Sequence, residues 1–255
     1  MTPDSSSLPI QAQTVPSSFH VPTKKPKDDE IMHVKAVCFD LYGTLAVVQK
    51  AMSVTQASDF LVSRGYEVYP QALEATWHYV SFVDYPKLGY KSCRAELKQV
   101  LWRLGIKPDS QTLKDLTEQY ERNTWKIFPD AEKAVDMAKD SQLKTAIVTS
   151  IARFKYKKAL RPIWDKIDVP VDGYTFHCEK SNPRIYLNTL EILGVKASEA
   201  VMIGDEPELD ILLPRKLGMK AILLDRAKQY SNKDCREADA IVNNLREAME
   251  IVRKI

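Results

Sequence analysis

The stretch Val34-Lys35-Ala36-Val37-Cys38-Phe39-Asp40-Leu41-Tyr42-Gly43-Thr44-Leu45 joins a short apolar run to a carboxylate and a glycine turn. The run has the length and the Val and Phe content of a buried strand, and it ends at a turn signal. In open parallel sheets, ligands gather beyond the carboxyl ends of the strands. The stretch therefore predicts a strand that delivers Asp40 to a functional edge. For Asp40 taken alone, an ordinary Asp-x-x-Gly turn is the alternative.

The composition is that of a globular chain without a strong global charge. Apolar residues make up 44% of 255 residues, which is enough for a core, and 37 Lys and Arg nearly balance 34 Asp and Glu. This balance predicts neither a nucleic-acid partner nor an anionic membrane partner. The four cysteines are widely spaced without a CxxC pair, and no apolar run reaches the length of a membrane span or a signal core. We expect a cytoplasmic protein with reduced thiols.

The order of patterns along the chain predicts its domains. Residues 1–33 carry five prolines and few large apolar groups, which predicts a mobile tail. Residues 47–126 have helical periodicity, which predicts an α-helical cap. Residues 34–46 and 127–255 alternate strands with helices, including an extended segment at 171–177. The fold class is therefore α/β, a Rossmann-like doubly wound parallel sheet with the cap inserted after its first strand.

Chemically active residues follow each of the expected strands. Asp40 follows the first, Thr149-Ser150 the second, Lys180 the third, and Gly204-Asp205-Glu206-Pro207-Glu208-Leu209-Asp210 the fourth. The carboxyl ends of parallel strands share one edge of the sheet. A nucleophilic carboxylate, hydroxyls, a lysine and an acidic cluster are therefore expected to meet there.

These four segments resemble the motifs of the haloacid dehalogenase superfamily. That family has an Asp-x-Asp-Gly-Thr-like loop, a hydrophobic strand ending in Thr or Ser, a lysine often followed by Pro-x-Pro, and a Gly-Asp loop with further acids. The matching segments here are Phe39-Asp40-Leu41-Tyr42-Gly43-Thr44-Leu45, Ile147-Val148-Thr149-Ser150, Lys180-Ser181-Asn182-Pro183-Arg184-Ile185-Tyr186 and Ile203-Gly204-Asp205-Glu206-Pro207-Glu208-Leu209-Asp210. The similarity covers residues 34 to about 245, including the place of the cap.

The resemblance implies a role for each residue. Asp40 would be the nucleophile and, with Thr149 and Lys180, would form the catalytic group, in which Lys180 keeps Asp40 ionised. Mg²⁺ would be the cofactor, because a carboxylate that attacks a phosphoryl group needs a cation between the two negative charges. The metal site would comprise Asp40, the Tyr42 main-chain carbonyl, Asp205 and Asp210, with Glu206 and Asp210 orienting ligands or waters. The substrate-binding residues would be Gly43, Thr44 and Ser150.

Tyr42 departs from the phosphatase pattern. Phosphatases of this superfamily usually carry a second aspartate two positions after the nucleophile, which protonates the leaving group. A phenol with a reference pKa near 10 is a poor replacement at neutral pH. Asp-x-Tyr-Gly-Thr resembles the metal-independent 2-haloacid dehalogenases, whereas Asp205 and Glu206 resemble the metal-dependent phosphatases.

Three functions therefore stay open. The acidic cluster favours a Mg²⁺-dependent phosphatase that acts on a small phosphorylated metabolite through an aspartyl-phosphate at Asp40. The alternatives are a 2-haloacid dehalogenase-type hydrolase that uses Asp40 without a metal, and a catalytically weak relative that binds a phosphorylated ligand. The substrate and the oligomeric state are not specified by the sequence.

Overall fold

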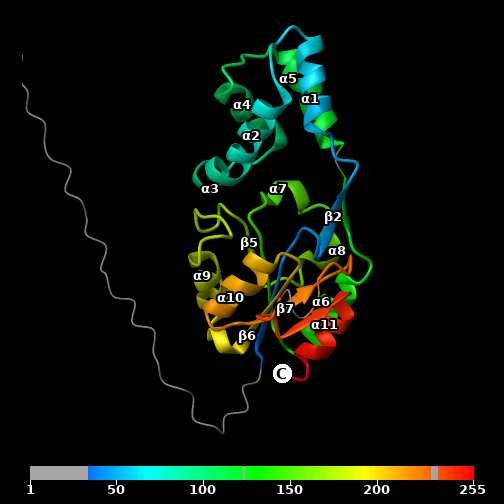
Figure 1. Ribbon diagram of the computed structural model, residues 1–255, viewed down its shortest axis with the longest axis vertical. Helices are drawn as coiled ribbons and strands as arrows, with labels where there is room; N and C mark the ends of the chain where they lie inside the picture. Colours follow the sequence, from blue (N-terminus) through cyan, green and yellow to red (C-terminus); the bar gives the residue numbers. More distant parts are fainter. Residues whose placement is uncertain (1–33, 123, 231–234) are drawn as a thin grey trace, which may run out of the picture. The chain divides into compact units, whose positions relative to one another are not determined.

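The structure is a computed structural model of the 255-residue chain, and it describes residues 34–122, 124–230 and 235–255. The tail predicted for residues 1–33 lies outside the described residues. Helices flank a central sheet, and a separate group of helices belongs to the inserted segment (Figure 1). In the three described ranges, no helix is long and apolar enough to cross a lipid bilayer.

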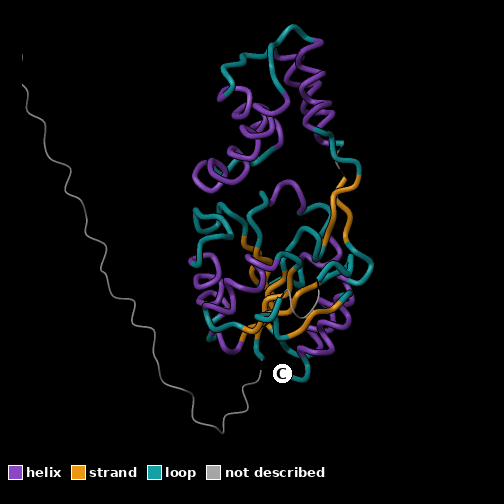
Figure 2. The backbone as a smooth tube through the Cα atoms, in the orientation of Figure 1, coloured by secondary structure: helices purple, strands orange, loops and turns teal. Residues whose placement is uncertain are grey.

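Six parallel strands form the central sheet, in the spatial order β5-β4-β1-β6-β7-β8. Figure 2 shows these strands in orange, with purple helices around them. The chain runs outward from β1 through β4 to β5, returns to β6 beside β1, and then runs outward the other way. The switch point, where ligands of such folds bind, therefore lies between β1 and β6. This arrangement confirms the predicted doubly wound sheet. The strand bounds are β1 Ala36–Phe39, β4 Lys144–Val148, β5 Val169–Val171, β6 Ala200–Gly204, β7 Lys220–Leu224 and β8 Ala240–Val242.

Both faces of the sheet are covered, which explains why β1 is apolar throughout. Side chains alternate along a strand, so successive residues of β1 enter different cores. Val37 and Phe39 pack with residues of α6 (Ala131–Asp140) and α11 (Leu245–Val252), whereas Cys38 packs with residues of α9 (Arg184–Leu193). The shorter helical segments of the core are α7 Arg153–Tyr156, α8 Arg161–Trp164, the 3₁₀ turn Ala197–Glu199, the π-helical segment Pro207–Leu212 and α10 Leu213–Lys216.

A two-stranded antiparallel ribbon joins the core to the inserted helices, and the sequence did not predict it. Its strands are β2 (Ala46–Gln49) and β3 (Thr124–Ile127), so the helical range expected from residue 47 to 126 begins and ends as strand. Each strand has only four residues, which is too short for alternation to stand out. Their pairing is also non-local, since the paired residues Gln49 and Thr124 lie 75 positions apart.

The segment after β5 also differs from the prediction. The sequence predicts an extended run over 171–177, but β5 ends at Val171. The Asp172 carboxylate accepts hydrogen bonds from the amide of Thr175 at 3.1 Å and from its hydroxyl at 2.8 Å. An aspartate that binds main chain a few residues ahead turns the chain locally, so the strand stops there.

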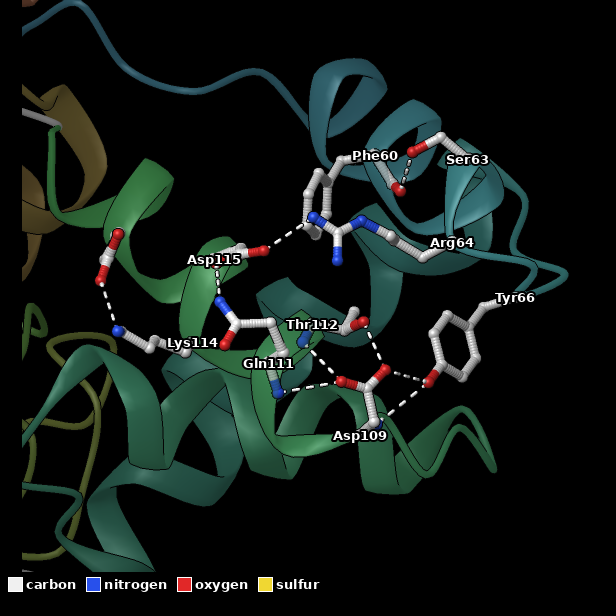
Figure 3. A network of polar contacts seen from close by, with 10 residues as sticks. Phe60, Ser63, Arg64, Tyr66, Asp109, Gln111, Thr112, Lys114 and Asp115 are labelled. Atoms are coloured by element: carbon white, nitrogen blue, oxygen red, sulfur yellow. Dashed lines mark hydrogen bonds and ion pairs between the residues drawn. The ribbon is translucent and has the colours of Figure 1, made fainter.

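The inserted helices form their own apolar core. Its central residues include Leu61, Leu97, Leu101 and Leu116, all of them buried. Side chains cap three of the helix starts, those that follow Ser53, Ser92 and Asp109. Asp109 also accepts a hydrogen bond from Tyr66 (Figure 3). The bounds are α1 Val54–Ser63, α2 Pro70–Tyr79, the π-helical segment Val80–Asp84, α3 Tyr85–Leu88, α4 Cys93–Arg103 and α5 Ser110–Glu121.

Candidate active site

The loop after β1 holds Asp40 in a fixed, nearly buried position. The Asp40 amide donates to the carbonyl of Ile203 at 2.9 Å, which extends the pairing of β1 with β6. The chain then turns at Gly43, whose φ of 80° lies in the left-handed region. A β-carbon at Gly43 would also lie 2.1 Å from Oδ2 of Asp205. Glycine is therefore required here both by the backbone conformation and by the close approach of Asp205.

Lys180 is buried and contacts two carboxylates. Its Nζ donates to Oδ1 of Asp40 and lies 2.5 Å from Oδ1 of Asp210. Burial by itself would lower the pKa of Lys180, but the charges of Asp210 and Asp40 outweigh that effect and raise it. Lys180 therefore stays protonated, and the expected contact between Lys180 and Asp40 is present.

Asp205 brings a further carboxylate to the same place. One oxygen of each of Asp40, Asp205 and Asp210 lies within 4.8 Å of the other two. The hydroxyl of Thr44 donates to Oδ1 of Asp205 at 3.2 Å. The ion pairs that the described residues make with these carboxylates come from Lys180. Lys180 thus pairs with two of the three acidic groups, and Asp205 has no ion pair of its own among the described residues.

Burial raises the pKa of all three carboxyl groups. It is the largest influence on Asp40, and Lys180 opposes it. Burial also raises the pKa of Asp210 to about 6, where Lys180 opposes it and Asp40 adds to it. The pKa of Asp205 is raised by burial and then by Asp210. The site therefore favours extra positive charge, because a nearby cation would stabilise the ionised forms.

Asp210 has a tightly built environment of its own. Its side chain is completely buried, and its Oδ2 accepts a hydrogen bond from the amide of Glu206 at 3.1 Å. A β-carbon on Gly204 would lie 2.1 Å from Cγ of Asp210, so β6 has to end in glycine. This close approach was not apparent from the sequence.

The two hydroxyl residues after β4 lie at the same edge. Oγ1 of Thr149 accepts a hydrogen bond from the amide of Ile151 at 3.2 Å, and Oγ of Ser150 accepts one from the amide of Lys180 at 2.9 Å. A hydroxyl that accepts one hydrogen bond still has its own proton to donate. Both side chains are therefore oriented by main chain and keep a donor for a ligand.

A cavity of about 510 Å³ opens above these residues. The predicted residues that line it are Asp40, Tyr42, Thr149, Ser150, Lys180 and Asp205. Thr44 and Asp210 are fully buried instead, and the Thr44 hydroxyl is directed to Asp205. The cavity is also lined by residues that were not predicted, among them His78 and Phe82 of the inserted segment, Glu179, Leu209 and Tyr230.

Arg226 is a supporting residue that sequence reasoning missed. Its guanidinium donates to the carbonyls of Gly43 at 3.2 Å and Thr44 at 2.9 Å. It also makes two hydrogen bonds, of 3.0 and 2.9 Å, to the carboxylate of Asp130. Arg226 comes just after β7, so its position at a strand end was the available signal. The pair therefore fixes the loop that carries Asp40.

Comparison with known proteins places the chain in a family. A family model described as a haloacid dehalogenase-like hydrolase matches residues 34–218. The chain is 30% identical over 177 residues to the (S)-2-haloacid dehalogenase of Xanthobacter autotrophicus, a match that covers 67% of each protein. It is 25% identical over 240 residues to a glyceraldehyde 3-phosphate phosphatase of Methanopyrus kandleri, covering 87% of this chain and 98% of that protein.

A third relative is matched over a shorter region. The chain is 33% identical over 123 residues to a putative pyrophosphatase PpaX of Caldanaerobacter subterraneus, which is 48% of this chain and 54% of that protein. This match therefore spans about half of the relative's length.

Solved structures share the fold. The 2-haloacid dehalogenase of Pseudomonas syringae superposes with a TM-score of 0.63 at 21% identity, covering 87% of this chain and 99% of that one. A HAD phosphatase of Thermococcus onnurineus has a TM-score of 0.55 at 23% identity, covering 86% and 98%. Since the family model matches well over half of its residues, the chain belongs to the haloacid dehalogenase-like hydrolases.

Proposed function

We propose that the protein is a Mg²⁺-dependent phosphatase that acts on a small phosphorylated substrate through an aspartyl-phosphate at Asp40. The observation that carries this proposal is the set of three carboxylates whose oxygens lie within 4.8 Å of one another beside a single lysine. Two like charges about 4 Å apart repel by about 4 kcal/mol in a protein environment. A site built to hold such charges together is suited to a divalent cation.

The donor set fits Mg²⁺. Carboxylate and main-chain carbonyl oxygens are the hard ligands that this ion prefers. Asp40, Asp205 and the carbonyl of Tyr42 would hold it, while Asp210, which is tied to Lys180 and to the Glu206 amide, completes the acidic site. When bound, the ion would offset the negative charge of the carboxylates and of the phosphoryl oxygens.

The protein's own groups account for the two chemical steps. An oxygen of Asp40 attacks phosphorus, and the bond to the leaving oxygen breaks with its electron pair on that oxygen. The leaving oxygen takes a proton from solvent water. A second water then attacks the phosphorus and releases a proton to solvent, the bond to Asp40 breaks, and the carboxylate is regenerated. Lys180 keeps Asp40 ionised, and the hydroxyls of Thr149 and Ser150 donate to phosphoryl oxygens.

The second candidate is a 2-haloacid dehalogenase activity without a metal. Tyr42 favours it, since it replaces the usual second aspartate of the phosphatases, and so does the similarity to the Xanthobacter enzyme. Asp205 and Glu206 favour the phosphatase, because an added halide or carboxylate substrate would meet further negative charge there.

Parallel assays of phosphate and halide release test the proposal. Phosphate should be released from a panel of phosphorylated metabolites with Mg²⁺, and EDTA should abolish the reaction. Release of halide from 2-chloropropionate by the chelated protein would assign the dehalogenase instead. If neither reaction occurs but a phosphate ester raises the melting temperature, the protein binds phosphorylated ligands without turnover.

A further inference from the structure

A second cavity, of about 1040 Å³, adjoins the cavity above Asp40 and is rich in aromatic side chains. Tyr42, Phe82 and Ile151 line both cavities, so the two meet there. A substrate with its phosphoryl group at Asp40 would therefore extend past Tyr42 into the second cavity. The aromatic residues that line this second cavity are Tyr42, Trp77, Phe82, Tyr120, Trp125 and Phe154.

Tyr42 belongs to this aromatic lining as well as to the catalytic loop. Its side chain is half exposed and packs edge to face against Trp125, with ring centroids 6.0 Å apart and an interplanar angle of 81°. Trp125 comes from β3 and Phe82 from the inserted helical segment, so aromatic rings line the cavity from both sides. Such an arrangement favours a planar ring over a chain of hydroxyls.

Charge contributes less to this cavity than ring contacts. Lys155 is paired with the buried Glu96 at 2.6 Å, so its charge is already compensated. The other charged residues that line the cavity are Lys91, Lys158 and Glu121, and all three are exposed to solvent. The second cavity therefore recognises mainly an uncharged, flat group.

The chemistry at Asp40 also favours an aromatic group, because the leaving oxygen has no aspartate to protonate it. Tyr42 stands where phosphatases of this family usually carry the aspartate that protonates the leaving oxygen. A phenolate can leave without that proton, because the pKa of a phenol is about 10. An alkoxide is nearly as basic as hydroxide, with a conjugate-acid pKa of about 16, and needs a general acid.

We infer that the substrate is an aryl phosphate monoester whose ring occupies the cavity between Tyr42, Phe82 and Trp125. This inference rests on the proposed phosphatase function. Asp40 forms a bond to phosphorus, the bond from phosphorus to the aryl oxygen breaks, and the electron pair leaves on the phenolate. The phenolate then takes a proton from water, and a second water hydrolyses the phosphoryl group from Asp40.

Three phosphorylated substrates separate the effect of the leaving group from the effect of ring binding in the cavity. Phenyl phosphate and cyclohexyl phosphate have rings of similar size but differ in the basicity of the leaving oxygen. Acetyl phosphate is small and has a good leaving group, so it reports the phosphatase step without the cavity. With Mg²⁺ and the full chain, kcat/KM for phenyl phosphate should exceed that for cyclohexyl phosphate by at least about a hundredfold, which is the lower range of what a general acid contributes.

Two variants test whether the ring binds in the cavity. Phe82→Ala and Trp125→Leu should each raise the KM for 2-naphthyl phosphate about tenfold, while kcat changes little. Two variants allow for the failure of one to fold, since Trp125 also packs against the core. Trp102→Ala is the matched control, because Trp102 is 65% exposed on α4 and does not line the cavity. Tyr42→Asp should raise the turnover of cyclohexyl phosphate selectively.

Several results would overturn the inference. Equal rates for phenyl and cyclohexyl phosphate would show that another group supplies the proton. Equal KM values for 2-naphthyl phosphate in the wild type and both cavity variants would show that the ring binds elsewhere. If acetyl phosphate is hydrolysed in either case, the phosphatase function stands and only this inference fails. If acetyl phosphate also stays intact, the phosphatase function fails and the inference fails with it.

Discussion

Two lysines, the buried Lys180 and the partly buried Lys155, stand in contrasting environments. Lys180 is surrounded by Asp40, Asp205 and Asp210, which leaves an excess of negative charge at the edge of the sheet. Lys155 on α7 faces one carboxylate, Glu96 on α4, and the pair is balanced. Burial by itself would lower the pKa of each lysine, and acidic partners raise it in both.

The difference in charge balance distinguishes a reactive site around Lys180 from a structural contact at Lys155. A balanced buried pair has no need of a further ion, so Glu96 and Lys155 serve to connect the inserted helices with the core. An unbalanced cluster is costly unless something else binds there, and fold stability alone gives no reason to keep it. The carboxylates around Lys180 are thus the part of the molecule arranged for chemistry.

The largest expected effect comes from removing the nucleophile. Asp40→Asn keeps the shape of the side chain but loses its charge, so phosphate release should fall by at least about a thousandfold. The measurement is initial rate with Mg²⁺ and saturating substrate. The variant should keep its circular dichroism spectrum, and a rate within tenfold of the wild type would show that another residue attacks phosphorus.

The balanced pair should matter for stability instead. Lys155→Met leaves the buried Glu96 without its cation and should lower the free energy of unfolding by about 3 kcal/mol. The double variant Lys155→Met with Glu96→Leu removes both charges and should recover much of that loss. Urea unfolding of the wild type, both single variants and the double variant measures the coupling. Additive losses would contradict the interpretation as a paired contact.

Arg226 is expected to link stability and activity. Arg226→Ala removes the guanidinium donor from the carbonyls of Gly43 and Thr44 and from Asp130, which keeps the Leu245 amide, so we expect a loss of about 2 kcal/mol in unfolding free energy. Because these carbonyls belong to the loop that carries Asp40, kcat should fall as well. Arg215→Ala is the control, since Arg215 pairs with Asp239 outside the site. Equal effects of the two variants on kcat would refute a positioning role for Arg226.

The smallest effect concerns an exposed acid. Hydrogen bonds from the Thr112 hydroxyl and amide, and then from Tyr66 and Gln111, lower the pKa of Asp109 to about 2 (Figure 3). The folded-state pKa lies below the unfolded value of about 3.9, so the carboxylate stabilises the fold above that pH and the contribution disappears as pH falls through about 2. Melting curves of the wild type and Asp109→Asn should differ above about pH 4 and converge towards pH 2. A difference that stays constant with pH would exclude this ionisation as its cause.

The residues at strand ends were the part of the site that the sequence made predictable. Asp40 and Asp205 directly follow β1 and β6, and the rule that such ends share an edge brings them together without knowledge of side-chain geometry. Lys180 reaches the same edge from a loop, nine positions after the end of β5. The contact between Lys180 and Asp40 was implied by the resemblance to the haloacid dehalogenase superfamily, and the structure contains it.

The unpredicted features depend on how the chain folds in space. Gly204 is required by Asp210, which lies only six positions later, but their close approach depends on the loop between them. Arg226 reaches Asp130 and the loop of Gly43, which lie 96 and 183 positions away in the sequence. The ribbon of β2 and β3 was not predicted either, because its two strands lie far apart in the sequence. The assignment of Tyr42 to an aromatic cavity likewise needed Trp125, which follows it by more than eighty positions.

The most direct test identifies what Asp40 carries during turnover. The protein is quenched in acid after brief incubation with acetyl phosphate and Mg²⁺, or with 2-chloropropionate and EDTA, and the peptide that contains Asp40 is analysed by mass spectrometry. We expect a phosphoryl group on Asp40 in the first sample and an unmodified Asp40 in the second. An ester that joins an Asp40 oxygen to C2 of propionate in the chelated sample, with no phosphoryl adduct in the first, would exclude the phosphatase reaction.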